Sequence, residues 1–148
     1  MHFRFIILIF AVSIVAKTDA RRPAYGDDAD EFARQMNLGK AHLENREPDQ
    51  AVTAMTAALK LVPNAPAALR NLARAHLLAR RYGKALESLA KSARIEPESA
   101  TVSYLSGLAH LRLLQFDQAV AHLERAVSLD ARSATLRFQL ASAYLAVN

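Results

Sequence analysis

Three histidines are the residues of this sequence whose type and spacing first suggest chemistry. His42, His76 and His110 follow one another at intervals of 34 residues, and imidazole nitrogens bind zinc at ~2.0–2.1 Å. Equivalent helices of successive repeats have another helix between them, and packed helices lie ~8–10 Å apart. Two of these histidines therefore cannot readily share one ion. We interpret them as half-buried packing residues and predict no metal site and no cofactor.

Catalytic motifs are absent from the sequence. The tripeptide HLE at 42–44 and at 122–124 matches half of a zinc deaminase signature, but the chain has no cysteine to complete it. The sequence contains no HExxH, no Gly-x-Ser-x-Gly, no phosphate-binding glycine loop and no dinucleotide fingerprint. No spacing pairs a nucleophile with a base. We predict that the protein is not an enzyme.

A sequence repeat of 34 residues predicts the structural elements that would position functional residues. The chain has 148 residues, enough for one domain, and its 52% hydrophobic and 22% charged residues exclude wholesale disorder. One column of small residues, spaced by 34, contains Ala51, Ala85 and Ala119. A second contains Gly39, Ala73, Gly107 and Ala141. The repeat divides the chain into units 32–65, 66–99, 100–133 and a partial unit, 134–148.

Each unit is predicted to form two amphipathic helices, because apolar residues recur at three- and four-residue steps. In the third unit these helices are expected over 100–113 and 117–129. Ser99 and Ser133 are candidate N-caps, and Pro48 suits a first helical turn. No segment shows sustained period-two alternation, so we predict no sheet.

The small columns predict close helix packing. Gly39, Ala73 and Gly107 would let the first helix of a unit approach the second. The larger residues that fill the remaining space are Met55, Leu89 and Leu123.

This pattern resembles the tetratricopeptide repeat. In the first unit the family's residues are matched by Leu38-Gly39, Ala51, Ala58-Leu59 and Pro63. Two columns depart from the family pattern. The early aromatic column of the first helix contains no aromatic residue, only Gln35, Leu69, Ser103 and Arg137. A column of leucines is interrupted by Ser106. A 35-residue RNA-binding helical-hairpin family fits the spacing and the closing proline less well. The resemblance implies an all-α fold, a right-handed helical-hairpin solenoid of about three and a half 34-residue units.

In tetratricopeptide repeat proteins the first helix of each unit lines a concave groove. The resemblance implies a partner-binding groove lined by Met36, Lys40, Leu43, Arg70, Arg74, Leu77, Thr101, Tyr104, Leu108, Leu111, Phe138 and Ser142. This mixed cationic and apolar stripe suits an acidic and apolar peptide or a partner helix. The family's carboxylate clamp for chaperone C-termini needs particular Lys, Arg or Asn residues at 36, 40, 71, 101 and 105, and only Asn71 matches.

Positive charge is concentrated in the second unit, where seven basic and three acidic side chains give a net +4. Such a field steers acidic partners. Tyr82 is the one aromatic residue among these charges, so the stacking aromatics of a nucleic-acid site are missing and we predict no nucleic-acid partner. The alternative for Arg70 and Arg74 is that they only keep an exposed helix solvated.

The last unit contains only one helix, so part of its apolar surface lacks the second helix of a complete repeat. We expect Leu136, Leu140, Tyr144 and Val147 to be partly uncovered. Large uncovered apolar patches often mark interfaces. The helix either caps the third unit or joins another chain, and a homo-oligomer is one of the alternatives.

The N-terminal end reads as a targeting segment. Residues 1–20 match a secretory signal peptide, with Arg4, an apolar run over 5–16 and small residues before a cleavage site after Ala20. An uncleaved anchor is the alternative, but a membrane span needs ~20 apolar residues, so we predict no stable span after cleavage. Residues 21–31 are expected to be a flexible leader. The mature chain is expected to be exported, and periplasmic in a bacterium rather than extracellular.

These observations predict a non-catalytic scaffold or adaptor of the cell envelope that holds a partner peptide or helix in the groove. Two alternatives remain open at this point. The protein could be a self-associating structural subunit that uses its C-terminal helix, or a docking subunit of an envelope enzyme complex.

Overall fold

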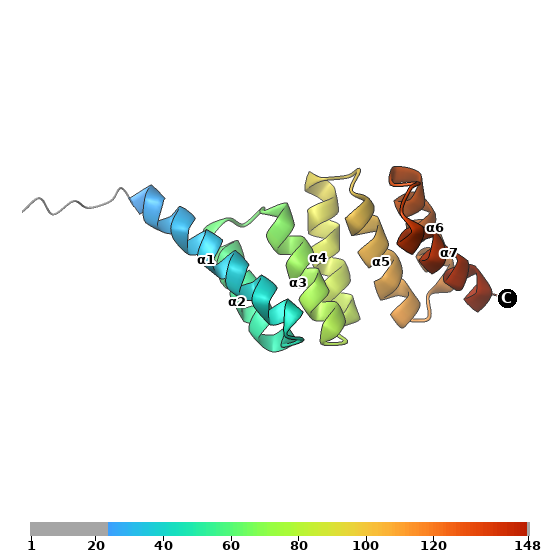
Figure 1. Cartoon of the computed structure of the whole chain (residues 1–148), viewed down its shortest axis with the longest axis horizontal. Helices are drawn as coiled ribbons and strands as arrows, with labels where there is room; N and C mark the ends of the chain where they lie inside the picture. Colours follow the sequence, from blue (N-terminus) through green and yellow to red (C-terminus); the bar gives the residue numbers. More distant parts are fainter. Residues whose placement is uncertain (1–23, 148) are drawn as a thin grey trace, which may run out of the picture.

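The described part of the chain consists of helices arranged in a row (Figure 1). The computed structural model describes residues 24–147, and within this range it contains helices and no strand. The helices are α1 (Ala24–Glu44), α2 (Pro48–Leu61), α3 (Pro66–Leu78), α4 (Tyr82–Ile95), α5 (Ala100–Arg112), α6 (Phe116–Leu129) and α7 (Ala134–Val147). The predicted all-α helical solenoid is confirmed.

The helix boundaries follow from local sequence. Ser99 Oγ accepts a hydrogen bond from the backbone N–H of Val102 at 3.3 Å, and Ser133 Oγ accepts one from Leu136 N–H at 3.4 Å. Both serines therefore cap the helices that follow them, as predicted. Pro48 lies in the first turn of α2, where its missing N–H costs nothing.

One type of turn joins the two helices of every complete hairpin. Its central residues, Arg46, Arg80 and Leu114, have φ of 60°, 58° and 59°. The backbone N–H of the next residue bonds back to the carbonyl of a histidine: Glu47 to His42 at 2.8 Å, Arg81 to His76 at 2.8 Å and Gln115 to His110 at 2.9 Å. A left-handed residue followed by this long backward bond ends a helix and satisfies its last carbonyls. The repeat thus extends to the turns.

The hairpins stack in sequence order and form two layers of helices. α1 contacts α3 and α3 contacts α5, whereas no comparable contact joins α2 to α4 or α4 to α6. The layer that contains α1, α3 and α5 is therefore the more closely spaced one. In a curved stack of hairpins the closely spaced layer is the inner side, so the face predicted to form a groove lies on the inner side.

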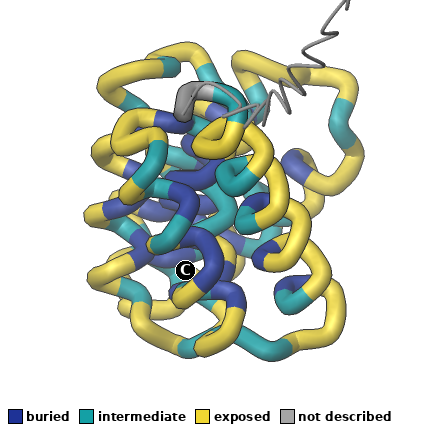
Figure 2. Tube along the Cα trace, turned by 90° about the vertical axis from the view of Figure 1, so that its left-hand side faces the viewer, coloured by how far each residue is buried: buried dark blue, intermediate teal, exposed yellow. Residues whose placement is uncertain are grey.

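The core runs between the two layers, and exposed residues face outward (Figure 2). Met55, Leu89 and Leu123 are the largest fully buried apolar side chains, which confirms the column of large packing residues. The column of Ala51, Ala85 and Ala119 is completely covered.

Gly39 and Gly107 lie where a side chain would meet the second helix of the same hairpin. A Cβ atom on Gly107 would lie 2.7 Å from Leu123 Cγ and 3.3 Å from the backbone oxygen of Ala119. A Cβ atom on Gly39 would overlap the side chain of Met55. A side chain at Gly107 would therefore overpack the contact between α5 and α6, whereas at Gly39 the flexible end of Met55 would have to move.

The first helix begins earlier than the sequence predicts. α1 starts at Ala24, so the leader expected over 21–31 is helical from residue 24 onward. Glu31 pairs with Arg34 and accepts a hydrogen bond from Gln35 Nε2 at 2.7 Å, and Phe32 packs against the core. These contacts one turn apart stabilise the extension. The targeting segment expected at 1–20 lies outside the described residues.

Candidate functional site

Ten of the twelve residues predicted to line a groove are exposed or half-buried on α1, α3, α5 and α7. Exposed are Lys40, Arg74, Thr101 and Phe138. Half-buried are Arg70, Leu77, Tyr104, Leu108, Leu111 and Ser142. The half-buried residues show part of their surface and still contact the helices behind them, as the lining of a groove requires.

Met36 and Leu43 are core residues and do not line the inner face. Each is 7% exposed. Met36 clusters with Met55, and Leu43 clusters with Ala51. The two residues are seven positions apart and so share one side of α1, and that side packs against α2. The sequence assigned them to the groove by position in the repeat, and tertiary packing places them behind it.

Leu77 and Leu108 meet in a hollow of the inner face, although 31 residues separate them in sequence. The hollow measures about 180 Å³ and is also lined by Leu78, Tyr82 and Arg112. It offers an apolar surface at the junction of the second and third units, with one guanidinium group beside it.

Only some of the basic side chains predicted to line the groove are unpaired within the described residues. Arg70 forms an ion pair with Glu96, so its charge is compensated within the protein. Arg74 Nη1 lies 3.4 Å from Asn71 Oδ1, a long hydrogen bond to a neutral amide. Arg74 and Lys40 are exposed, and no acidic side chain within residues 24–147 forms an ion pair with either of these two cations of the predicted groove.

Three of the four residues expected to be partly uncovered on the C-terminal helix are so, including Tyr144 at 44% exposure, and the fourth is buried. Leu136 is buried at 7% exposure, and the hydroxyl of Tyr144 hydrogen-bonds to Glu124 of α6. Leu140 is half-buried, and Val147 is 48% exposed. The most exposed apolar residues are Phe138 at 68% and Leu145 at 80%. The expectation for Leu136 was therefore wrong, because α7 turns that residue toward the third unit.

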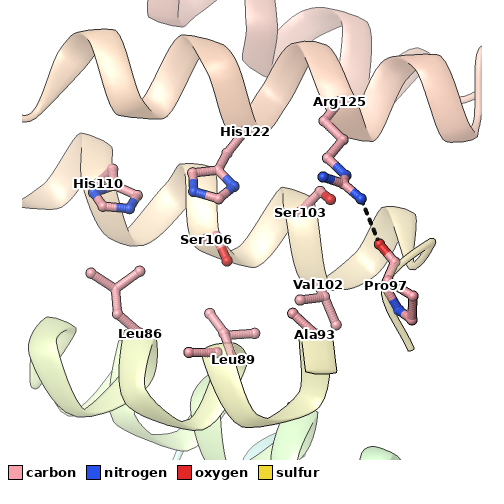
Figure 3. A pocket seen from close by; sticks show the side chains of 11 residues that line it. Leu86, Leu89, Ala93, Pro97, Val102, Ser103, Ser106, His110, His122 and Arg125 are labelled. Carbon is pink, nitrogen blue, oxygen red and sulfur yellow. Dashed lines mark hydrogen bonds between the residues drawn. The ribbon is translucent and has the colours of Figure 1, made fainter. Parts of the chain in front are cut away.

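A second concave feature lies between α4, α5 and α6 (Figure 3). This cleft has a volume of about 460 Å³. Its lining is Leu86, Leu89, Ala90, Ala93 and Pro97, then Val102, Ser103, Ser106 and His110, and finally His122 and Arg125. At 100° per residue, the α5 residues of this lining and the α5 residues of the predicted groove fall on opposite sides of the helix. The cleft is therefore separate from the inner face.

Two small residues open the cleft. Ser103 stands in the aromatic column of the repeat, and Ser106 stands in the leucine column that contains Leu38, Leu72 and Leu140. Both serines are on α5 and line the cleft, three residues apart and therefore on one side of the helix. Both departures are visible in the sequence, and taken together they could have predicted the hollow, because two large side chains are missing from one face of the same helix.

The polar side of the cleft carries two stacked histidines. The rings of His110 and His122 are nearly parallel, with centroids 5.2 Å apart and an angle of 10°. Burial lowers the pKa of His122, and the charges of His110 and Arg125 lower it further, so the ring is neutral at neutral pH. Arg125 Nη2 donates a hydrogen bond to the backbone oxygen of Pro97 at 2.9 Å.

Metal-binding clusters and membrane-spanning helices are both missing from residues 24–147. This part of the chain has no cluster of three or more histidine, cysteine or acidic side chains arranged to hold a metal ion. None of its helices is long and apolar enough to cross a membrane.

Comparison with known sequences identifies the repeat. A family model described as "Tetratricopeptide repeat" matches residues 36–100 and 104–146, which together make up more than half of the chain. No curated protein sequence matches the chain.

Several solved structures share the fold. The tetratricopeptide domain of Sgt2 from Aspergillus fumigatus is 21% identical, with 79% of each chain covered and a TM-score of 0.75. The second such domain of human RPAP3, in complex with the HSP70 peptide SGPTIEEVD, is 14% identical, with 79% of this chain and 98% of that chain covered and a TM-score of 0.73. MamA from Desulfovibrio magneticus RS-1 is 25% identical, with 77% of this chain and 64% of that chain covered and a TM-score of 0.72.

Proposed function

This chain belongs to the tetratricopeptide repeat family, and on that premise we propose that it is a non-catalytic scaffold or adaptor of the cell envelope. Its inner face binds an extended peptide or a helix of a partner protein. The observation that carries this proposal is the combination, on one face, of the apolar hollow at Leu77 and Leu108 with the exposed cations Lys40 and Arg74. One of the similar structures, that of human RPAP3, contains a bound peptide.

The partner is proposed to carry both acidic and apolar side chains. Its acidic groups meet Lys40, Arg74 and Arg112, and an apolar side chain fills the hollow between α3 and α5. Recognition by a carboxylate clamp is not part of this proposal, because Met36 and Leu105 are buried and Thr101 cannot supply a cation. The partner is thus recognised along its length rather than by a C-terminal carboxylate at those positions.

The envelope location rests on the sequence of residues 1–20. A positively charged start, a short apolar run and a small-residue cleavage site are the features of a secretory signal. The intact mass of the protein recovered from the periplasmic fraction tests this part of the proposal. A mass that begins at Arg21 supports export and cleavage, and a mass that includes residues 1–20 contradicts cleavage.

Affinity capture from an envelope extract tests the inner face. One bait is the unmodified exported protein, and the second carries Lys40→Glu and Arg74→Glu. The matched control is Arg94→Glu, which reverses an exposed charge on α4, in the other layer. We expect one set of partners on the unmodified and control baits and its loss from the double variant, with circular dichroism showing that all three are folded. Equal capture by all baits would exclude these two cations as recognition residues.

Self-association is the second candidate, favoured by the exposure of Phe138 and Leu145 on α7. Light scattering distinguishes it from the first. A dimer that becomes a monomer in Phe138→Ser, Leu145→Ser protein supports it, and a monomer at high concentration of the unmodified protein counts against it. A docking subunit of an envelope enzyme complex would behave like the scaffold in the capture experiment and would be recognised by the identity of the captured partner.

A further inference from the structure

We propose that the cleft between α4, α5 and α6 is a second binding site, and that its ligand is a small carboxylate with an apolar body, such as an aryl or branched aliphatic acid. This site goes beyond the proposed function, because its lining lies on the side of α5 opposite the inner face. Both sites can be occupied at once.

The α4 wall of the cleft is suited to the apolar body of a ligand. Leu86, Leu89 and Ala93 of α4 line one side, and Val102 of α5 adjoins them (Figure 3). The volume of about 460 Å³ lies within the range of ~300–1,000 Å³ that small-molecule sites have. Burial of an aromatic ring or a branched chain against these methyl groups supplies the non-directional part of the binding free energy.

The back of the cleft contains two serines whose hydroxyl oxygens are not used by the fold and are not fully buried. Ser103 and Ser106 are 5% and 6% exposed, and both line the cleft. Neither side chain makes a hydrogen bond to any residue that the structure describes. Both hydroxyls are therefore available to hydrogen-bond a polar group of a ligand in the cleft.

The polar side of the cleft, which contains His110 of α5 and His122 and Arg125 of α6, favours a negative charge. Arg125 uses one guanidinium N–H for Pro97, and its other N–H groups make no hydrogen bond to residues 24–147. His110 uses Nδ1 for Gln115, at 2.7 Å from Oε1, and the ring of His122 makes no hydrogen bond among the described residues. No acidic side chain lines the cleft. Glu96 and Glu98 lie in the adjoining hollow, and Glu96 is already paired with Arg70.

A monoanion fits this arrangement better than a phosphate group. The lining contains one permanent cation, Arg125, and two imidazoles, of which His122 is held neutral by burial and by the neighbouring His110 and Arg125. A carboxylate needs one cation and a few neutral donors, which Arg125, His122 and the two serines can provide. A dianion would remain partly uncompensated beside an apolar wall, at a high desolvation cost.

Titration of 3-phenylpropionate into the full-length protein, followed by amide chemical shifts, tests the proposal. We expect saturable shifts confined to α4, α5 and α6, and at least about tenfold weaker binding of the uncharged analogue 3-phenylpropanamide. Arg125→Gln should weaken binding of the acid about tenfold and leave that of the amide unchanged. The matched control Arg74→Gln removes an exposed cation of the inner face and should bind the acid as the unmodified protein does.

A variant that fills the cleft with a larger side chain is the most direct test of the proposal. Ser106→Leu introduces the residue that the equivalent positions 38, 72 and 140 already contain, so this variant should fold and melt at or above the unmodified temperature. It should no longer bind 3-phenylpropionate. Undiminished binding by Ser106→Leu, equal binding of the acid and the amide, or no saturable shift up to about 10 mM would overturn the proposal. Each of these results leaves the inner-face function untouched, because that face is tested by capture of a protein partner.

Discussion

Arg81 leaves the side chain of His76 without the hydrogen-bond acceptor that the equivalent histidines have. In the other two complete hairpins, the residue five positions after the histidine provides this acceptor. His42 Nδ1 lies 2.5 Å from Glu47 Oε2, and His110 Nδ1 lies 2.7 Å from Gln115 Oε1. The residue five positions after His76 is Arg81, whose guanidinium group can only donate. His76 Nδ1 is buried with no hydrogen-bond partner in the part of the chain that the structure describes.

Replacing this arginine by glutamine should stabilise the protein. Arg81→Gln gives His76 the amide acceptor that His110 has, and a buried hydrogen bond of this kind contributes about 0.5–1.5 kcal/mol. The substitution also removes the exposed pair between Arg81 Nη2 and Asp49 Oδ1, which are 2.7 Å apart, and such pairs contribute about 0–1 kcal/mol.

Arg81→Met is the control for that experiment, because it loses the Asp49 pair and provides no acceptor. Urea unfolding should therefore rank Arg81→Gln above Arg81→Met. The reverse order, or equal free energies of unfolding, would show that Arg81→Gln does not stabilise the protein by giving His76 Nδ1 a hydrogen-bond partner.

Mild acid should destabilise the solenoid. Burial lowers the pKa of His76, the positive charges of Lys84 and Arg81 lower it further, and Glu87 acts weakly in the opposite direction. Burial also lowers the pKa of His122. The unfolded chain, with histidine pKa values of about 6.5, then takes up protons at a higher pH than the folded chain. The contribution of these two neutral histidines to the free energy of unfolding is therefore complete above pH ~6.5 and is lost as the pH falls below that value.

Melting temperatures at pH 7.5 and pH 5 check this expectation. The unmodified protein should melt at a lower temperature at pH 5, and the difference should be smaller in His76→Tyr, which places there the residue that position 144 of the same column contains. A melting temperature that does not change over this interval would contradict the linkage.

Adding a side chain at Gly107 should destabilise the third hairpin. The first added carbon would lie 2.7 Å from Leu123 Cγ, and Leu123 is fully buried and has little room to move. Gly107→Leu is expected to cost about 1–3 kcal/mol by overpacking. Gly83→Leu is the matched control, because nothing lies within 4 Å of a Cβ built at Gly83. Equal thermal melts of the two variants would refute the close approach of α5 and α6.

The turn between α5 and α6 should gain stability from a glycine. Leu114 has a φ of 59° and is 72% exposed, so it bears the cost of a left-handed backbone and contributes little burial. A leucine in this conformation costs about 1–2 kcal/mol relative to glycine, and part of this is offset by the flexibility of glycine in the unfolded chain. Leu114→Gly should therefore raise the free energy of unfolding by about 0.5–1 kcal/mol.

Leu113→Gly is the control for the turn. Leu113 precedes the turn residue and has a φ of −91°, which leucine adopts without strain, so glycine should bring no gain there. Chemical denaturation of both variants distinguishes relief of backbone strain from a general effect of removing an exposed leucine. A gain of the same size in both would assign the effect to the loss of apolar surface.

The sequence by itself determined the repeat, the helices and the pairs of residues that pack within a hairpin. Gly107 and Leu123 could be matched from the columns alone, because both belong to one 34-residue unit and their helices are joined by a short turn. The caps at Ser99 and Ser133 were predictable for the same reason, since each serine bonds to a backbone group three residues away. These features depend on neighbours that are close along the chain.

Only the tertiary structure decided which side of each helix remains accessible. Met36 and Leu136 were assigned to surfaces by their position in the repeat, and packing against α2 and α6 buries them. Arg70 was predicted to line the groove, and Glu96, 26 residues away, compensates its charge. The cleft at Ser103 and Ser106 needs α4, α5 and α6 from two successive units to exist at all. Spacing within one unit fixes the hairpin, whereas the surfaces available to ligands arise where one hairpin meets the next.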